Sequence, residues 1–470
     1  MKNMFLAARK ALKWLLVAAL GLLVLLLACW FLLPDETLHP EARKILAAPP
    51  SVPPDQNAFY LLWGLPASPE LDPFQVGRQV VAAQLATFRE KGQRVQFDPA
   101  SFYGAKPYQG RIPSGLYCDS GRKTAHCLTA LRAHRSELDA QRWAQDVYVQ
   151  RYRALRNYPH FEQTMTPSPA APLLSWQTVL ALSELVDASI AFDMEQPERR
   201  AAALAELQAE IALWRRIGRE ADFLIDRTII TVLLRNKYRL LSELLTEYPA
   251  IAHQNRELVA QMTMPLTLAD TDLRRVLSGE FRYGALLLEN MVQDSKQGRQ
   301  SGLDHELPRW VEELALRLFV RSNATLNLSF SRLTESGNFY AQSATQIESR
   351  ADAFFKTYEV SSLDPRLWLY NPVGKILMSY QGSALLYHSH KLHDLAGYTR
   401  LVELQRQIAA AHLPGDKVGS FLTSVDASLR DPYSGQPMTF DPVLQTISFR
   451  PRSEVSAGGD PLSVKLGTQM

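Results

Sequence analysis

The stretch LAELQAEIALWRRI, residues 204–217, decides the fold class, because its large apolar side chains recur at the spacing of an α-helix. These side chains are Leu204, Leu207, Ile211, Trp214 and Ile217. A second run with the same period precedes Pro249 and consists of Ile230, Leu234, Tyr238, Leu241 and Leu245. A third, around Leu314 and Leu318, follows Pro308. Each run predicts a helix that buries one face.

The chain around these runs shows no alternation typical of β-strands. Between Leu173 and Asp364 the prolines are Pro197, Pro249, Pro265 and Pro308, each at a plausible helix boundary. We therefore predict a mostly α protein with antiparallel helices in a bundle-like domain. No self-similar repeat of solenoid length is found, so a bundle is favoured while a solenoid stays open.

The N-terminal region contains a long apolar segment, WLLVAALGLLVLLLACWFLL, at residues 14–33. Twenty helical residues span a hydrocarbon core of about 30 Å, so the segment predicts a transmembrane helix. Basic residues precede it and acidic residues follow it, which predicts a cytoplasmic N-terminus and a periplasmic body at the bacterial inner membrane. They are Lys2, Arg9, Lys10 and Lys13 before it, and Asp35 and Glu36 after it.

Two alternatives to an uncleaved helix exist. A cleaved secretory signal is disfavoured because the apolar run is longer than usual and no small-residue cleavage site follows it before Pro34. The tetrapeptide Leu26-Leu27-Ala28-Cys29 is similar to a lipobox, in which Cys29 would be lipidated. Residues 30–33 continue the apolar run where a polar tether is expected, so lipidation is the minority alternative.

The rest of the chain divides by composition. Proline pairs predict a semi-rigid stalk, and the stretch PRSEVSAGGDPLS at residues 451–463 contains almost no large apolar side chains, which predicts a disordered tail. The expected parts are a cytoplasmic basic segment (1–13), the transmembrane helix (14–33), a proline-rich stalk (34–56), a helical periplasmic domain (57–415), a small C-terminal element with the turn DPYSG and a hairpin (416–451), and a disordered tail (452–470).

Composition excludes some functions. With 470 residues, of which 46% are hydrophobic, the chain can bury a large core. Four of its 51 basic residues precede the apolar segment, so 47 remain beside 48 acidic ones. A near-neutral body lacks the basic surface that nucleic-acid binding requires. The expected partners are the inner membrane and envelope proteins.

Two cysteines lie in the predicted periplasmic body. Cys118 and Cys127 enclose the hydrophilic octapeptide DSGRKTAH, and in an oxidising compartment this predicts a disulfide. Two unpaired thiols are the alternative. A metal site is disfavoured because His126 would supply only a third ligand.

Histidines cluster only at residues 388–393. On a helix, His390 and Asp394 would share one face at a spacing that can hold a divalent metal. An ordinary hydrogen-bonded polar face is preferred, because the HExxH arrangement is missing. A nucleophile elbow, a P-loop and a dinucleotide fingerprint are also missing, so no catalytic residue and no cofactor are predicted.

Four segments carry a resemblance to a known family. They are NAFYLLWGL at 57–65, the Cys118–Leu128 loop, RYRAL at 151–155, and LRDPYSGQP at 429–437, where Gly435 can take a positive φ. The first three resemble a family of uncharacterised proteobacterial proteins with a single membrane anchor and a periplasmic body. The fourth is similar to a DPFSGKP element of exported and pilin-like proteins. The resemblance implies a topology and no activity.

Three functions are compatible with these observations. The favoured hypothesis is a non-enzymatic interaction or assembly module of the cell envelope. The second is a binding module for a lipid or another apolar ligand. The third is a metal-dependent envelope hydrolase that uses His390 and Asp394. The aromatic residues, 8 Trp and 17 Tyr among them, favour core packing over a ligand groove.

Overall fold

The computed structural model describes most of the chain in segments. The described residues are 13–22, 24–25, 34–91, 95–108, 110, 127–168, 170–296, 320–358, 370–379, 382–453 and 460–467. They form two compact units: unit 1 comprises 1–48, 284–333 and 352–383, and unit 2 comprises 49–283, 334–351 and 384–470. Each unit is considered by itself below. The predicted class, mostly α with a small antiparallel β element, is confirmed.

Unit 2 contains most of the helices. Its α-helices are α3 (Ala58–Gly64), α4 (Pro73–Lys91), α5 (Cys127–Ala133), α6 (Arg135–Ala144), α7 (Asp146–Ala154), α8 (Trp176–Asp193), α9 (Arg200–Glu220), α10 (Leu224–Glu247), α11 (Ile251–Gln254), α12 (Arg256–Met262), α13 (Leu268–Thr271) and α21 (Gly415–Ser424). Its short 3-10 turns are η1 (Pro54–Gln56), η2 (Pro99–Phe102), η3 (Leu155–Asn157), η4 (Pro197–Arg199) and η5 (Ala427–Leu429).

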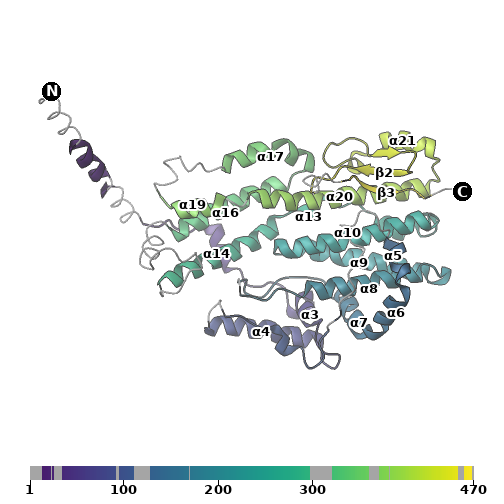
Figure 1. The fold of residues 1–470 in the computed structure, drawn as a ribbon, viewed down its shortest axis with the longest axis horizontal. Coiled ribbons are helices and arrows are strands. Elements are labelled where there is room, and N and C mark those ends of the chain that lie inside the picture. The colour runs from purple at the N-terminus through teal and green to yellow at the C-terminus, as the bar shows by residue number, and fades with distance from the viewer. Residues whose placement is uncertain are drawn as a thin grey trace. The chain divides into compact units, whose positions relative to one another are not determined.

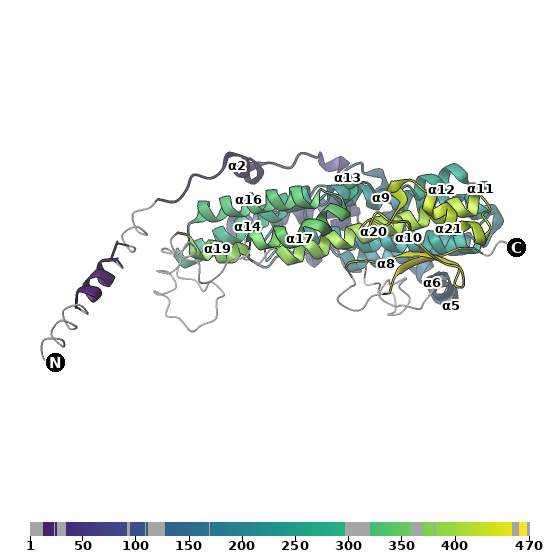
Figure 2. The ribbon, with the colours of Figure 1, turned by 90° about the horizontal axis from the view of Figure 1, so that it is seen from above.

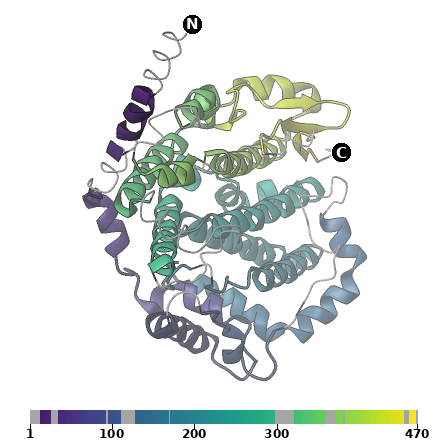
Figure 3. The same ribbon diagram turned by 60° about the vertical axis from the view of Figure 1, so that its left-hand side comes forward.

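The core of unit 2 lies among α8, α9 and α10, which pack against one another (Figures 1 and 3). Every residue of the two helical stripes predicted from the sequence is buried, the first on α9 and the second on α10. Helix α8 is buried on all sides, from Trp176 to Phe192 with few interruptions, because α7, α9 and α10 contact it. The third predicted run, at Leu314 and Leu318, lies outside the described residues.

Unit 1 contains α2 (Pro40–Ala47) and α19 (Pro372–Ser379). Helices α14 (Arg274–Lys296), α16 (Ser322–Tyr340), α17 (Ala344–Tyr358) and α20 (Gly382–Ala410) contribute residues to both units. Helix α2 lies within the predicted stalk, so that stalk is not extended throughout. His39 caps this helix by accepting the Glu41 amide at 3.2 Å, and its own amide donates to Asn327 of α16 at 2.8 Å.

The predicted hairpin is present and belongs to a three-stranded antiparallel sheet (Figure 2). Strands β1 (Thr439–Asp441) and β2 (Thr446–Phe449) pair with Phe440 opposite Ile447. The predicted disordered tail is wrong in part, because it contains β3 (Leu462–Lys465), which pairs with β2. The Lys465 carbonyl accepts hydrogen bonds from Thr246 and Gln405 at 2.8 Å, so helices α10 and α20 hold this strand.

The turn DPYSG takes the predicted form. Gly435 has a φ of +68°, and the Asp431 carboxylate accepts the Tyr433 amide at 2.8 Å. The carboxylate of an Asp at the start of such a turn replaces a backbone acceptor, which explains the sequence pattern.

The prediction of a transmembrane helix at residues 14–33 is corrected. Among the residues that the structure describes, no helix has both the length and the apolar character needed to cross a membrane. Of that range, residues 14–22, 24 and 25 are described and are helical. Cys29, the predicted lipidation site, lies outside the described residues.

Candidate functional site

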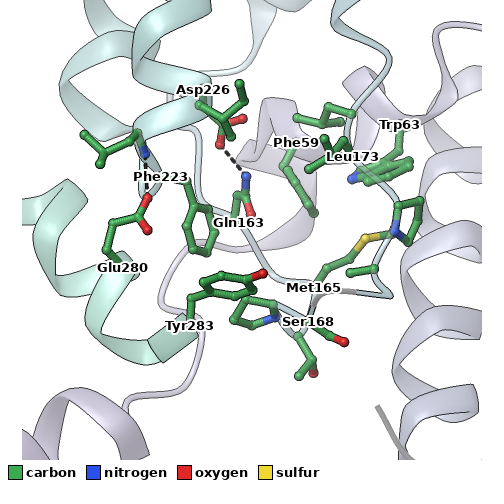
Figure 4. Close-up of a pocket in the computed structure, with 17 residues that line it drawn as sticks. Phe59, Trp63, Gln163, Met165, Ser168, Leu173, Phe223, Asp226, Glu280 and Tyr283 are labelled. Atoms are coloured by element: carbon green, nitrogen blue, oxygen red, sulfur yellow. Dashed lines mark hydrogen bonds between the residues drawn. The ribbon is translucent and has the colours of Figure 1, made fainter. Parts of the chain in front are cut away.

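Unit 2 contains a pocket of about 500 Å³, which we call the aromatic pocket (Figure 4). Its lining comes from α3, from the segment between η3 and α8, from the α9–α10 connection with the first turn of α10, and from α14. The lining residues are Phe59, Trp63, Gln163, Met165, Thr166, Pro167, Ser168, Ala171, Pro172, Leu173, Leu174, Phe223, Leu224, Ile225, Asp226, Glu280 and Tyr283.

The aromatic side of the pocket is built on α3. Glycines allow this helix to pack closely on α4, since a Cβ at Gly64 would lie 1.6 Å from the Pro73 carbonyl oxygen. Asn57 caps α3 by accepting the Phe59 amide at 3.0 Å, and its side-chain amide donates to the Glu162 carbonyl at 2.8 Å. The segment NAFYLLWGL therefore forms the aromatic side of the pocket. Through the hydrogen bond of Asn57 to Glu162, it also positions the neighbouring lining residue Gln163.

Trp63 has a buried donor without a partner. Its side chain is 3% exposed and packs edge-to-face on Phe59, with ring centroids 6.2 Å apart. Within the described part of the chain, no acceptor forms a hydrogen bond with its indole Nε1. Figure 4 shows this nitrogen on the side of the ring that faces the other lining residues. Since buried polar groups are normally paired, the indole N–H is available to a ligand acceptor.

The opposite side of the pocket carries two carboxyl groups, Asp226 and Glu280, which we call the carboxyl pair (Figure 4). Asp226 lies in the first turn of α10 and is 2% exposed. It accepts hydrogen bonds from Trp176 Nε1 at 3.0 Å and from Gln163 Nε2. Both donors are uncharged. Burial raises the pKa of Asp226 to about 7, although a helix N-terminus favours a negative charge.

Glu280 of α14 caps α10. Its Oε1 accepts the Leu224 amide at 2.8 Å, and no side chain of α10's own N-terminus does so. Helix α14 can approach this closely because of Gly279, where a Cβ would lie 1.8 Å from the Asp222 carbonyl oxygen. Burial raises the pKa of Glu280, in the same direction as that of Asp226, while the hydrogen bond from the Leu224 amide lowers it.

Asp222, four residues before Asp226, has a different environment. It does not line the pocket, and its Oδ1 lies 3.2 Å from Arg275 Nε and 3.4 Å from Arg282 Nη2. Burial raises its pKa while the two arginines lower it. The carboxyl outside the pocket therefore has cationic partners, and the two inside it have neutral ones.

Apolar side chains surround the entrance. Leu173 is 72% exposed and Ile225 is 46% exposed, and both line the pocket. Exposed aliphatic side chains at the rim of an apolar cavity are typical of a site that receives an apolar ligand from outside.

The predicted metal ligands have other partners. Asp394 accepts hydrogen bonds from the Tyr433 hydroxyl at 2.6 Å, from the amides of Arg452 and Ser453 at 2.9 Å, and from the Ser453 hydroxyl at 2.5 Å. His390 Nε2 lies 2.7 Å from Glu348. The described residues contain no group of three His, Cys, Asp or Glu side chains that could hold a metal ion. Asp394 instead forms hydrogen bonds with Arg452 and Ser453, which precede β3 in the chain.

The predicted disulfide involves one residue outside the described part. Cys118 is the residue concerned, so the predicted bond between Cys118 and Cys127 lies outside the described residues. Cys127 is buried at the first residue of α5, and its amide donates to Glu243 at 2.8 Å.

Comparison of the chain with protein-family models, with curated proteins and with solved structures gives no match. The resemblance to membrane-anchored proteobacterial proteins and the predicted periplasmic location therefore stay predictions.

Proposed function

We propose that this protein binds an apolar ligand, a lipid or a molecule of similar character, in the aromatic pocket. The observation that supports this is a cavity of about 500 Å³ whose lining is mostly aliphatic and aromatic. Pockets for small ligands have volumes of roughly 300–1,000 Å³ and combine apolar walls with few polar groups. The aromatic pocket has both properties, and its polar groups are concentrated in the carboxyl pair and the Trp63 indole.

The alternative of an envelope interaction module stays a prediction. It rests on topology and on missing catalytic motifs, whereas the pocket is a feature that the described residues build. A metal-dependent hydrolase loses support, because the hydrogen bonds of Asp394 are made to the chain around Tyr433 and Ser453.

Binding is tested with the uncharged fluorophore Nile red, whose emission increases in apolar surroundings. The purified protein is expected to bind it saturably, with one molecule per chain. Replacing Ala171 by Trp puts an indole into the pocket, so Ala171→Trp should weaken binding about tenfold or more by occupying the ligand's volume.

The matched control is Ala170→Trp. Ala170 is the preceding residue and does not line the aromatic pocket, so this variant should bind Nile red as the wild type does. Circular dichroism checks that both variants are folded. Absence of saturable binding to the wild type, or equal binding by the two variants, would contradict the proposal.

A further inference from the structure

We infer that the polar end of the ligand is a protonated amine, which the carboxyl pair receives. This inference rests on the proposed function and names the class of ligand: an apolar amine rather than a fatty acid or another anionic amphiphile. The supporting observation is that one carboxyl group near the α9–α10 connection forms ion pairs with arginines, whereas the two that line the pocket do not.

The pairing differs between neighbouring carboxyl groups. Asp222 lies against two arginines, while neither Asp226 nor Glu280 forms an ion pair with any lysine or arginine that the structure describes. Buried carboxylates in proteins normally have a cationic partner. The described lining of the aromatic pocket contains no lysine or arginine that could serve as this partner for the carboxyl pair.

The carboxyl pair also has unused hydrogen-bonding capacity. A carboxylate has about four lone-pair positions, of which Asp226 uses two and Glu280 uses one. An ammonium group carries three donors and no acceptor, so it matches these positions. A ligand carboxylate or phosphate would find no cation at this end of the pocket among the described residues and would be repelled by each carboxyl group that is ionised, so it would be disfavoured.

The aromatic lining suits the same ligand. Phe59, Trp63, Phe223 and Tyr283 line the pocket together with the carboxyl pair, as Figure 4 shows. Aromatic rings accommodate both an alkyl chain and an adjacent cation, which their faces attract. The ammonium group itself has no acceptor, so the Trp63 indole N–H would pair with an acceptor elsewhere on the ligand.

The experiment measures displacement of Nile red by three probes with the same alkyl chain: decylamine, decanol and decanoate. On the wild type at neutral pH, decylamine should displace the fluorophore at a concentration about tenfold lower than decanol, because a charge-assisted hydrogen bond is added. Decanoate should be the weakest. Equal displacement by amine and alcohol, or a preference for decanoate, would overturn the inference and leave the proposed function intact.

Single substitutions test which carboxyl groups cause the preference for decylamine. Asp226→Asn should reduce the preference for decylamine over decanol to about twofold or less, because the charge is lost while the side chain keeps its shape. Glu280→Gln retains an acceptor for the Leu224 amide and should also reduce the preference. The control Glu257→Gln removes one exposed carboxylate outside the pocket and should keep the wild-type preference.

The two proposals fail in different ways. If Nile red does not bind the wild type, the proposed function fails. If Nile red binds and Asp226→Asn and Glu280→Gln both retain the full preference for the amine, only the inference about the carboxyl pair fails.

Discussion

Two regions of unit 2 bury acidic side chains and differ in what they place beside them. In the core, Lys237 Nζ lies 2.6 Å from Asp187 and 3.4 Å from Glu210, and all three side chains are buried. We call these residues, together with Tyr152 and Arg156, the buried ion network. Tyr152 donates to Glu210 at 2.6 Å and Arg156 donates to it at 2.7 Å. In the aromatic pocket, the carboxyl pair has no such cation among the residues that the structure describes.

These different surroundings change the pKa values of the buried carboxyl groups. Burial raises the pKa of Glu210, but Lys237 and Arg156 outweigh this effect and the net pKa lies below its usual value. Asp226 is as well buried and has a pKa of about 7. Burial raises the pKa of Asp187 to about 6 although Lys237 lowers it, whereas Glu210, which also contacts Arg156, has a lowered pKa. The comparison teaches that the balance between burial and the number of cationic partners decides the charge of a carboxyl. Groups with uncompensated burial in a pocket are typical of functional sites.

The largest effect is expected from breaking the buried ion network. Replacing Lys237 by Met leaves Asp187 and Glu210 without their cation in the core, which should lower the free energy of unfolding by about 3–5 kcal/mol. Urea unfolding followed by circular dichroism measures this. A loss of less than about 1 kcal/mol would show that the network is not paired as described.

In contrast, Asp226→Asn should increase the free energy of unfolding at pH 8. The pKa of Asp226 is about 7 in the folded protein and 3.8 as its usual value, so the folded state binds more protons than the unfolded state between these values. Stability contributed by this group is therefore lost as the pH rises through that window. Asparagine does not ionise, so the variant should be more stable at pH 8 by roughly 1–4 kcal/mol.

The pH dependence provides the check on that prediction. The advantage of the variant should shrink as the pH falls through 7 and vanish near 4, measured as the difference in urea midpoint between variant and wild type at each pH. Asp222 and Glu280 both face Asp226 and raise its pKa further, while Gln163 and Trp176 lower it. A difference that does not change with pH would contradict the assignment.

A smaller effect is expected on ligand selectivity. The preference of the wild type for decylamine over decanol should increase several-fold between pH 6 and pH 8, because Asp226 loses its proton in this range and the amine keeps its own. Displacement of Nile red at each pH measures it. The same Asp222, Glu280, Gln163 and Trp176 groups surround the carboxyl, and a flat profile would argue against a charged contact.

The smallest effect is expected from Asp222→Asn. Arg275 and Arg282 lower the pKa of this carboxyl but do not cancel the effect of its burial, and its pKa stays above the usual value. Both arginines are about a third or more exposed, so water screens the pairs. The free energy of unfolding should change by less than about 1 kcal/mol at pH 8. If Asp222→Asn stabilised the protein as much as Asp226→Asn, the contrast between the two positions would be wrong.

The helices that carry these regions could be predicted from the sequence. The buried faces of α9 and α10 can be recognised in the sequence because an amphipathic helix repeats its apolar residues every three or four positions. This periodicity is local and does not depend on residues that are distant in the chain. The strand β3 could not be predicted in the same way. Its four residues, Leu462–Lys465, are ordered by pairing with β2 and by contacts with α10 and α20.

The candidate site was visible only in fragments. The segment NAFYLLWGL stood out by its aromatic residues, and core packing was the favoured interpretation; Phe59 and Trp63 are in fact buried and also line the pocket. Asp226 and Glu280 gave no signal, because isolated acidic residues are common in a chain with 48 of them. The histidine cluster drew attention to Asp394, which does not line the aromatic pocket.

The sequence by itself determined the helical class, the buried faces of α9 and α10, and the turn at Gly435, since each depends on residues that are close in the chain. Only the tertiary structure decided that Asp226 and Glu280 share a pocket while Glu210 faces Lys237. The physical reason is that the cost of burying a charge, and the partner that offsets it, are set by side chains from distant helices.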